Sequence, residues 1–362
     1  RPGAPDGAVT MNDLTPPRAT PPGATPCPDT RLLDEFQRDL PLVPRPFAAM
    51  GAALGLTEAE VLDRLTRLKA SGRITRVGAT CRPNTAGAST LAALAIPAAR
   101  IEAVINDDLG PGVAEPGVNH SYLREDDWNL WFVATAPTEA ELSACLARIE
   151  AASGLRVLSL PLVRPFNIDL GFRLSGPRAA LGLDRAADMD VLRDDDRPLM
   201  QALSAGLPLV PQPFAALAEA LGRSEAEVID RIAALSAARI LTRVGVIVRH
   251  RALGWTANAM VVWRLPESRI EAAGTALAQL PGVTLCYQRR TVPGVWDWPL
   301  FCMIHARTRP EAMAVLARAR ALPALSDAPH KILFSTHCFK QRGALIEASA
   351  EAPAAHPAEA DA

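Results

Sequence analysis

The chain has 362 residues, a formal net charge of −1 and six widely spaced cysteines. Its length allows two or more domains, and no apolar run approaches the roughly 20 residues that a membrane span needs. The balanced charge argues against a protein that binds mainly through DNA phosphates, and the absence of a Cys-x-x-Cys pair argues against a disulfide framework or a zinc site.

The first 30 residues are rich in Pro and lack the apolar segment of a secretory signal. They predict a disordered extension, and the protein is expected in the cytoplasm. The residues beyond Leu345 are rich in Ala, Glu and Pro and predict a second disordered segment.

An internal repeat organises the rest of the chain. Leu40 to Gly78 aligns without a gap with Leu207 to Gly245, and 24 of the 39 positions are identical. The matching words include Pro-Leu-Val-Pro-x-Pro-Phe and Thr-Arg-Val-Gly. The two segments are 167 residues apart, and each full copy of about 145 residues is far longer than a solenoid unit. The chain is therefore a tandem duplication of domains.

Each copy opens with a predicted winged helix-turn-helix. In the first copy the helices are expected at 32–39, 47–54 and 57–70, with Gly55 ending the second. Thr57-x-x-Glu60 and Ser224-x-x-Glu227 are capping boxes that begin the third helix of each copy. These acidic helix starts would repel DNA, so DNA reading is not expected.

Each copy then continues as strand, helix, strand, strand, helix, strand, the order of a ferredoxin-like βαββαβ unit. The elements are expected at 90–96, 99–109, 118–123, 129–135, 139–151 and 156–162, and in the second copy at 257–264, 268–280, 283–290, 300–306, 310–321 and 331–334. The fold class is therefore α+β. The expected divisions are 1–30 (extension), 31–87 and 197–254 (winged helix-turn-helix), 88–174 and 255–344 (ferredoxin-like), 175–196 (polar linker) and 345–362 (tail).

Three polar side chains lie in or directly after the predicted strand at 118–123. His120, Tyr122 and Arg124 are two residues apart, so they share one face of the strand. Aligning Pro116-Gly117-Val118 with Pro281-Gly282-Val283 places Tyr287 and Arg289 at the positions of Tyr122 and Arg124. Leu285 takes the position of His120. The two copies therefore share a Tyr/Arg pair but only one contains the imidazole.

These motifs resemble a known family. Asn-His-x-Tyr-x-Arg followed by Asn-Leu-Trp-Phe (Asn119 to Phe132), Phe-Asn-Ile-Asp-Leu-Gly-Phe (Phe166 to Phe172) and Leu-Phe-Cys-Met-Ile-His (Leu300 to His305) are similar to the sirohaem decarboxylases with the Lrp/AsnC architecture. The two unlike halves resemble a fused D and L subunit pair. The resemblance implies an intramolecular pseudo-dimer and leaves a further homodimer open.

The resemblance implies oxygen-independent removal of CO2 from two acetate side chains of sirohaem, giving 12,18-didecarboxysirohaem for haem d1 or an alternative haem pathway. It implies a tetrapyrrole ligand, contacts with other haem d1 biosynthesis proteins, and no membrane partner. No cofactor beyond the iron-bearing substrate and no metal-ligating residue is implied.

The reaction replaces a carboxylate by a proton, so it needs an acid that titrates near neutral pH, and histidine suits this role. His120 is the candidate acid, with Tyr122 orienting or relaying the proton and Arg124 binding a carboxylate that does not react. In the second copy Tyr287 is the matching tyrosine, and His305, which replaces Thr135, either supplies the missing imidazole or packs between strands.

Binding several substrate carboxylates needs cationic donors, and the macrocycle needs apolar walls. The candidate substrate-binding residues are Arg76, Arg124, Arg164, Arg243, Arg249, Arg289, Arg290, Lys340, Trp131 and Trp298.

Alternatives remain for several of these features. Strand tyrosines and tryptophans are often core residues, Thr-Arg-Val-Gly can be simple wing geometry with a glycine backbone angle, and Arg249-His250-Arg251 can be a solvated face. For the whole chain, the other readings are a ligand-responsive transcriptional regulator and a haem-binding sensor or carrier.

Overall fold

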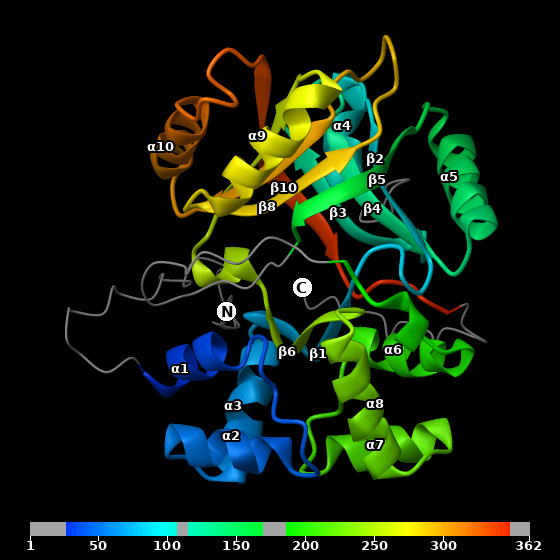
Figure 1. Cartoon of the computed structure of the whole chain (residues 1–362), viewed down its shortest axis with the longest axis vertical. Coiled ribbons are helices and arrows are strands. Elements are labelled where there is room, and N and C mark those ends of the chain that lie inside the picture. The colour runs from blue at the N-terminus through cyan, green and yellow to red at the C-terminus, as the bar shows by residue number, and fades with distance from the viewer. Residues whose placement is uncertain (1–26, 107–114, 169–185, 348–362) are drawn as a thin grey trace, which may run out of the picture.

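The computed structural model describes residues 27–106, 115–168 and 186–347. The lower body in Figure 1 contains two helix-turn-helix units. They comprise α1 (Pro28–Glu35), α2 (Pro46–Leu54) and α3 (Glu58–Ala70), and α6 (Arg197–Ala205), α7 (Pro213–Leu221) and α8 (Glu225–Ala237). Both predicted capping boxes form: Thr57 begins α3 and Ser224 begins α8.

The strand that follows each unit pairs with its counterpart from the other half. β1 (Ile74–Cys81) and β6 (Leu241–Val248) form an antiparallel two-stranded ribbon in which Gly78 lies opposite Gly245. A Cβ atom on either glycine would lie 2.4 Å from a backbone oxygen of the facing helix region, that of Leu203 or Phe36. The glycine of Thr-Arg-Val-Gly therefore permits close packing and does not provide an unusual backbone angle.

Above the ribbon, the two predicted ferredoxin-like units form one closed barrel (Figure 1). The strands are β2 (Ala88–Leu94), β3 (Val118–Arg124), β4 (Leu130–Ala136) and β5 (Leu158–Asn167), then β7 (Ala257–Trp263), β8 (Val283–Arg289), β9 (Leu300–Ala306) and β10 (His330–Gln341). Their order around the barrel is β10-β3-β4-β2-β5-β8-β9-β7. β3 pairs with β10 and β5 pairs with β8, so each half closes the sheet of the other.

Four helices accompany the barrel: α4 (Ala98–Asn106), α5 (Glu139–Ser153), α9 (Glu267–Gln279) and α10 (Arg309–Arg320). Apolar residues fill the space between helices and strands in two clusters, one for each half. A third cluster fills the barrel interior, where Trp131 and Trp296 meet edge to face with ring centroids 5.1 Å apart. Trp296 lies in the segment between β8 and β9, so this connection packs into the barrel.

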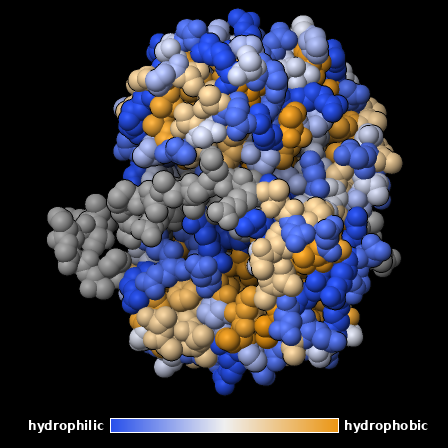
Figure 2. Space-filling model, in the orientation of Figure 1, coloured by the Kyte–Doolittle hydropathy of each residue, from blue (hydrophilic) through white to orange (hydrophobic). Residues whose placement is uncertain are grey.

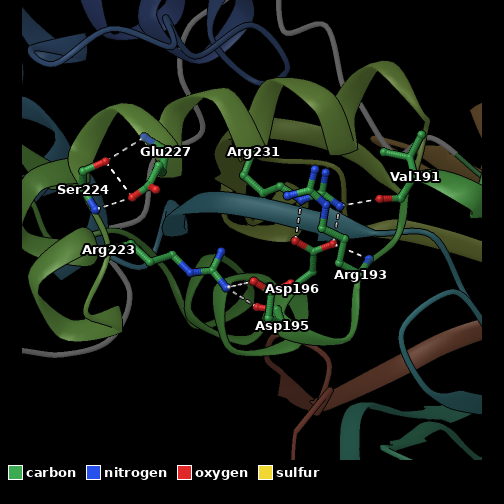
Figure 3. Close-up of polar contacts among 8 residues, drawn as sticks. All are labelled: Val191, Arg193, Asp195, Asp196, Arg223, Ser224, Glu227 and Arg231. Carbon is green, nitrogen blue, oxygen red and sulfur yellow. Dashed lines mark hydrogen bonds and ion pairs between the residues drawn. The ribbon is translucent and has the colours of Figure 1, made fainter.

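The described part of the predicted linker, residues 186–196, is mostly exposed but is anchored at its end by Asp196. It contains the short 3-10 helices η1 (Met189–Val191) and η2 (Asp194–Asp196). Asp196 is fully buried and accepts hydrogen bonds from Arg231 Nε (2.5 Å) and the Arg193 amide (2.7 Å) (Figure 3). Asp196 thus fixes the linker against α8, because the Arg231 guanidinium neutralises the buried carboxylate.

The predicted disordered tail begins at residue 345, and its first three residues, 345–347, are ordered, whereas 348–362 lie outside the described residues. Residues 341–347, here called the strap, continue from β10 and pack against α6. The amides of Ile346 and Glu347 donate to Gln201 Oε1 at 2.7 and 3.2 Å, and the Leu345 amide donates to Thr135 Oγ1 at 2.9 Å. Ile346 is buried in the helical core, so burial of its apolar side chain holds the strap in place.

On the face shown in Figure 2, hydrophobic residues gather on the lower, helical body. The exposed large hydrophobic residues include Val43 and Val210, which occupy the same position in the two Pro-Leu-Val-Pro-x-Pro-Phe words. No helix among the described residues is both long and apolar enough to cross a membrane. The predicted Asp169 to Phe172 motif and the predicted helix end at 107–109 lie outside the described residues.

Candidate active site

A cavity of about 360 Å³ lies between the β1–β6 ribbon, the barrel and the strap. Both halves contribute to it, so the two Tyr/Arg pairs line one common space. Its described lining contains no Asp or Glu. It contains three histidines and six arginines: His120, His250, His305, Arg76, Arg82, Arg124, Arg243, Arg289 and Arg342. Such a lining suits a ligand with several negative charges.

The two Tyr/Arg pairs have the same geometry. The Arg124 guanidinium lies over the Tyr122 ring at 5.4 Å, and that of Arg289 lies over the Tyr287 ring at 4.6 Å. Arg124 Nη1 donates to the Leu333 carbonyl (3.2 Å), and Arg289 Nη1 donates to the Leu160 carbonyl (2.8 Å). Each arginine is thereby held by the last strand of the other half.

Both arginines retain hydrogen-bonding capacity. The Nε atoms of Arg124 and Arg289 are buried without a partner, and neither residue forms an ion pair with a described carboxylate. Burial lowers the pKa of both guanidinium groups and raises the pKa of Tyr122 and Tyr287. A carboxylate ligand would supply the missing acceptor and the missing negative charge.

The ribbon provides a second pair of arginines. Arg76 on β1 and Arg243 on β6 are matching residues of the two Thr-Arg-Val-Gly words, and both are buried in the cavity wall. Burial lowers the pKa of Arg76, and its Nε has no hydrogen-bond partner. The ribbon therefore adds positive charge opposite the barrel.

His120 lies at the cavity as the alternation on β3 predicts. Its Nδ1 is 3.1 Å from Asn119 Oδ1. Burial, together with the nearby charge of Arg76, lowers the pKa of His120 to about 4. Without a ligand the imidazole is therefore neutral at pH 7, which differs from the expectation of an acid that titrates near neutrality.

A second group of histidines lies on the other side of the pseudo-symmetric cavity. His250, in η3 (His250–Leu253), packs edge to face with His305 on β9, with ring centroids 4.6 Å apart. Both side chains are more than nine-tenths buried. The sequence allows Arg249-His250-Arg251 to be a solvated face, whereas His250 is buried in the structure. No periodicity identifies it, because it lies in a single 3-10 turn.

Five of the predicted binding residues lie away from the cavity lining. Arg164 pairs with Glu271, Arg249 and Arg290 are exposed, and Trp298 lies beneath the Lys331 ammonium (5.8 Å). Lys340 Nζ donates to the Glu115 carbonyl (2.9 Å). The remaining predicted binding residues, Arg76, Arg124, Arg243, Arg289 and Trp131, all line the cavity, as do the four predicted catalytic residues.

Among the described residues, no group of three or more His, Cys, Asp and Glu side chains could hold a metal ion. The described cysteines are free, and burial raises the pKa of Cys81, Cys286 and Cys302. These three cysteines lack the thiolate character of reactive thiols.

A ligand cavity between a barrel made from two AsnC-like sheets and the ribbon of two helix-turn-helix units defines a ligand-binding protein of the Lrp/AsnC fold. Family models agree: residues 86–167 and 252–340 match an AsnC-like ligand-binding domain, and residues 29–74 and 196–241 match the helix-turn-helix domain of NirDL-like sirohaem decarboxylases.

The chain is 72% identical to the sirohaem decarboxylase NirDL subunit of Paracoccus denitrificans, over 88% of this chain and 97% of that protein. The chain therefore belongs to the sirohaem decarboxylase family. It is also similar to the separate NirD and NirL subunits of Stutzerimonas stutzeri, 48% identical over 41% and 41% identical over 40% of this chain, with 94% and 85% of those subunits covered. This agrees with an intramolecular pseudo-dimer.

A solved structure of a sirohaem decarboxylase NirDL in complex with an iron-uroporphyrin III analogue has the same fold. Its TM-score is 0.60 at 26% identity, and the match covers 88% of this chain and 94% of that one. That relative thus binds a tetrapyrrole.

Proposed function

We propose that this chain decarboxylates sirohaem, removing the carboxyl groups of two acetate side chains without oxygen to give 12,18-didecarboxysirohaem. The observation that carries the proposal is the cavity with nine cationic or imidazole side chains and no described carboxylate. A tetrapyrrole with several carboxylates complements this charge. Family membership supports the same substrate.

The arginines bind the substrate and hold its reacting side chains. The orphan Nε atoms of Arg124 and Arg289 are oriented donors for two carboxylates, one on each side of the pseudo-two-fold axis. Trp131 and the apolar barrel interior beneath it provide a wall for the macrocycle. Arg76 and Arg243 would bind carboxylates that do not react.

Proton delivery requires an imidazolium, because the neutral ring has no proton of suitable acidity to give to carbon. The substrate can create this state itself. A carboxylate next to His120 favours the charged imidazole and raises its pKa from the low value that burial imposes. When the bond to CO2 breaks, the methylene carbon takes this proton and becomes a methyl group. Tyr122 remains protonated and orients the carboxyl group.

The product implies a place before the final steps of haem d1 formation, and other proteins of that pathway are the proposed partners.

The test is anaerobic, reducing incubation of the purified chain with sirohaem, followed by mass spectrometry of the tetrapyrrole. Loss of two CO2 is expected. Unchanged sirohaem in the presence of folded protein would contradict the proposal, and a salt-sensitive gel shift with DNA would favour a regulator instead.

A further inference from the structure

The carboxamide of Asn258 is a buried polar group at the cavity wall. Asn258 lies on β7, where Met260 and Val262 belong to the cluster that fills the barrel interior. Because alternate residues of a strand share a face, the Asn258 side chain points inwards as well. It is only 3% exposed, and its Nδ2 and Oδ1 atoms are buried without a hydrogen-bond partner among the described residues. Such an amide is costly unless a ligand or water completes its hydrogen bonds.

The lining contains two other asparagines, and both have described partners. Asn84 Oδ1 accepts a hydrogen bond from Ser89 Oγ at 2.8 Å, and Asn119 Oδ1 lies 3.1 Å from His120 Nδ1. Asn258 differs from them because both ends of its amide are available to a ligand.

The matching residue of the first half does not offer the same donor. Asn258 lies opposite His305 between β7 and β9, and the same register between β2 and β4 places Ser89 opposite Thr135. Ser89 is thus the counterpart of Asn258. A serine hydroxyl has one hydrogen, and Ser89 donates it to Asn84. At these two matching positions, only the second half presents a donor to the cavity.

The arginines at the cavity, by contrast, form pairs that the pseudo-two-fold axis interchanges. Arg124 matches Arg289, and Arg76 matches Arg243. A macrocycle turned by this rotation meets the same pairs again, so these arginines favour neither orientation over the other. Selection of one orientation requires unlike residues at matching positions.

Orientation matters for the reaction because sirohaem has no two-fold symmetry and carries more acetates than the two that react. The orientation of the macrocycle in the cavity decides which acetates lie beside the reacting groups. We propose that Asn258 determines this orientation, and hence which acetates lose CO2, by donating a hydrogen bond from Nδ2 to a substrate carboxylate that does not react. This inference rests on the proposed function.

A neutral amide suits this role because its effect depends on position. An arginine attracts a carboxylate over several ångströms, whereas the amide stabilises only a carboxylate within hydrogen-bond distance. In the turned orientation, a group without an acceptor would displace water from Asn258 and leave its donor unpaired. This loss disfavours the turned orientation by about 5- to 100-fold. No described Asp or Glu lines the cavity to repel the bound carboxylate.

The first test compares the products of Asn258→Leu and Ser89→Ala. Leucine has a similar volume and no polar atom, so N258L removes the donor and leaves little empty space. With sirohaem under anaerobic, reducing conditions, the wild type should form one didecarboxylated isomer. N258L should form a mixture of isomers of the same mass, separated by chromatography and assigned by NMR, with the minor share raised by about 5- to 100-fold.

The matched control S89A removes the counterpart hydroxyl and should give the wild-type isomer. Asn258→Ser, which installs the residue of the first half, is the second variant and should give the same mixture as N258L. Formation of the wild-type isomer alone by both N258L and N258S would overturn the proposal.

The second test does not depend on turnover. Iron-uroporphyrin III also lacks two-fold symmetry, because one of its pyrrole rings carries acetate and propionate in the reverse order. Proton NMR of the ferric complex should show one set of hyperfine-shifted meso-proton signals with the wild type and two sets with N258L. Identical spectra would overturn the proposal. If the wild type leaves sirohaem unchanged, the proposed function fails, whereas two sets of signals with N258L still support orientation by Asn258.

Urea unfolding without ligand separates this role from a purely structural one. Replacing a buried, unpaired amide by an apolar side chain of similar size is nearly neutral or stabilising, so N258L should unfold at the same urea concentration as the wild type or a higher one. Unfolding of N258L at a lower concentration, together with the wild-type isomer and spectrum, would identify Asn258 as a structural residue and overturn the proposal.

Discussion

Removing the imidazole of His120 should make the ligand-free protein less sensitive to acid. Its pKa is about 4 in the folded protein and 6.5 in an ordinary exposed histidine. Between these values the unfolded chain binds the proton and the folded chain does not, so stability falls as the pH decreases from 6.5 towards 4. At pH 5 this difference amounts to about 2 kcal/mol for one histidine, and it is nearly absent at pH 7.5.

The assay is urea unfolding of the wild type and His120→Leu at pH 7.5 and pH 5, followed by circular dichroism. Leucine occupies the matching position 285, so the site tolerates its shape. The loss of unfolding free energy between the two pH values should be about 2 kcal/mol smaller in the variant. His330→Leu, outside the cavity, is the control. Equal acid sensitivity in H120L and the wild type would refute the reasoning, and with it the need for substrate carboxylates to charge this ring.

Three further outcomes are expected. Arg124→Ala or Arg289→Ala should weaken binding of iron-uroporphyrin III in an absorbance titration by about 10- to 100-fold, because one charged hydrogen bond contributes about 1.5–3 kcal/mol; Arg164→Ala, outside the cavity, should not. Asp196→Ala should lower the unfolding free energy by about 3–5 kcal/mol by leaving the Arg231 charge buried and unpaired, whereas Asp195→Ala, which breaks an exposed pair with Arg223, should cost less than about 1 kcal/mol. Gln201→Ala should increase hydrogen exchange at the Ile346 and Glu347 amides, and Gln201→Glu, which keeps the acceptor oxygen, should not; equal protection in Q201A would show that Gln201 does not hold the strap.

The fold could be predicted where the sequence pattern is local. Capping boxes begin α3 and α8 as predicted, and the alternation of His120, Tyr122 and Arg124 correctly places all three at one cavity. Contacts between the two halves could not be predicted as well from the sequence. β10 was predicted only at 331–334, because the polar residues that follow show no alternation. The strand continues to Gln341 because β3 of the other half pairs with it, through two irregularities in register.

The candidate site was predicted less completely than the fold. Lys340 and Arg164 have the right chemistry for carboxylate binding, but Lys340 donates to Glu115 and Arg164 pairs with Glu271. Sequence spacing does not show such competing partners. Asn258 was not predicted as a site residue, because an asparagine in an apolar strand looks like a core residue in the sequence. Only the structure shows that its buried amide has no hydrogen-bond partner.

The closed barrel has a consequence for assembly, since each half-sheet offers two edges that only another half-sheet can cover. Separate subunits could satisfy those edges by pairing like with like. A barrel of two first halves would contain His120 twice and neither His250 nor His305, and a barrel of two second halves would contain the reverse. Joining the halves in one polypeptide raises the local concentration of the unlike partner to about the millimolar range. Fusion therefore favours, at every expression level, the mixed barrel in which both kinds of imidazole face one cavity.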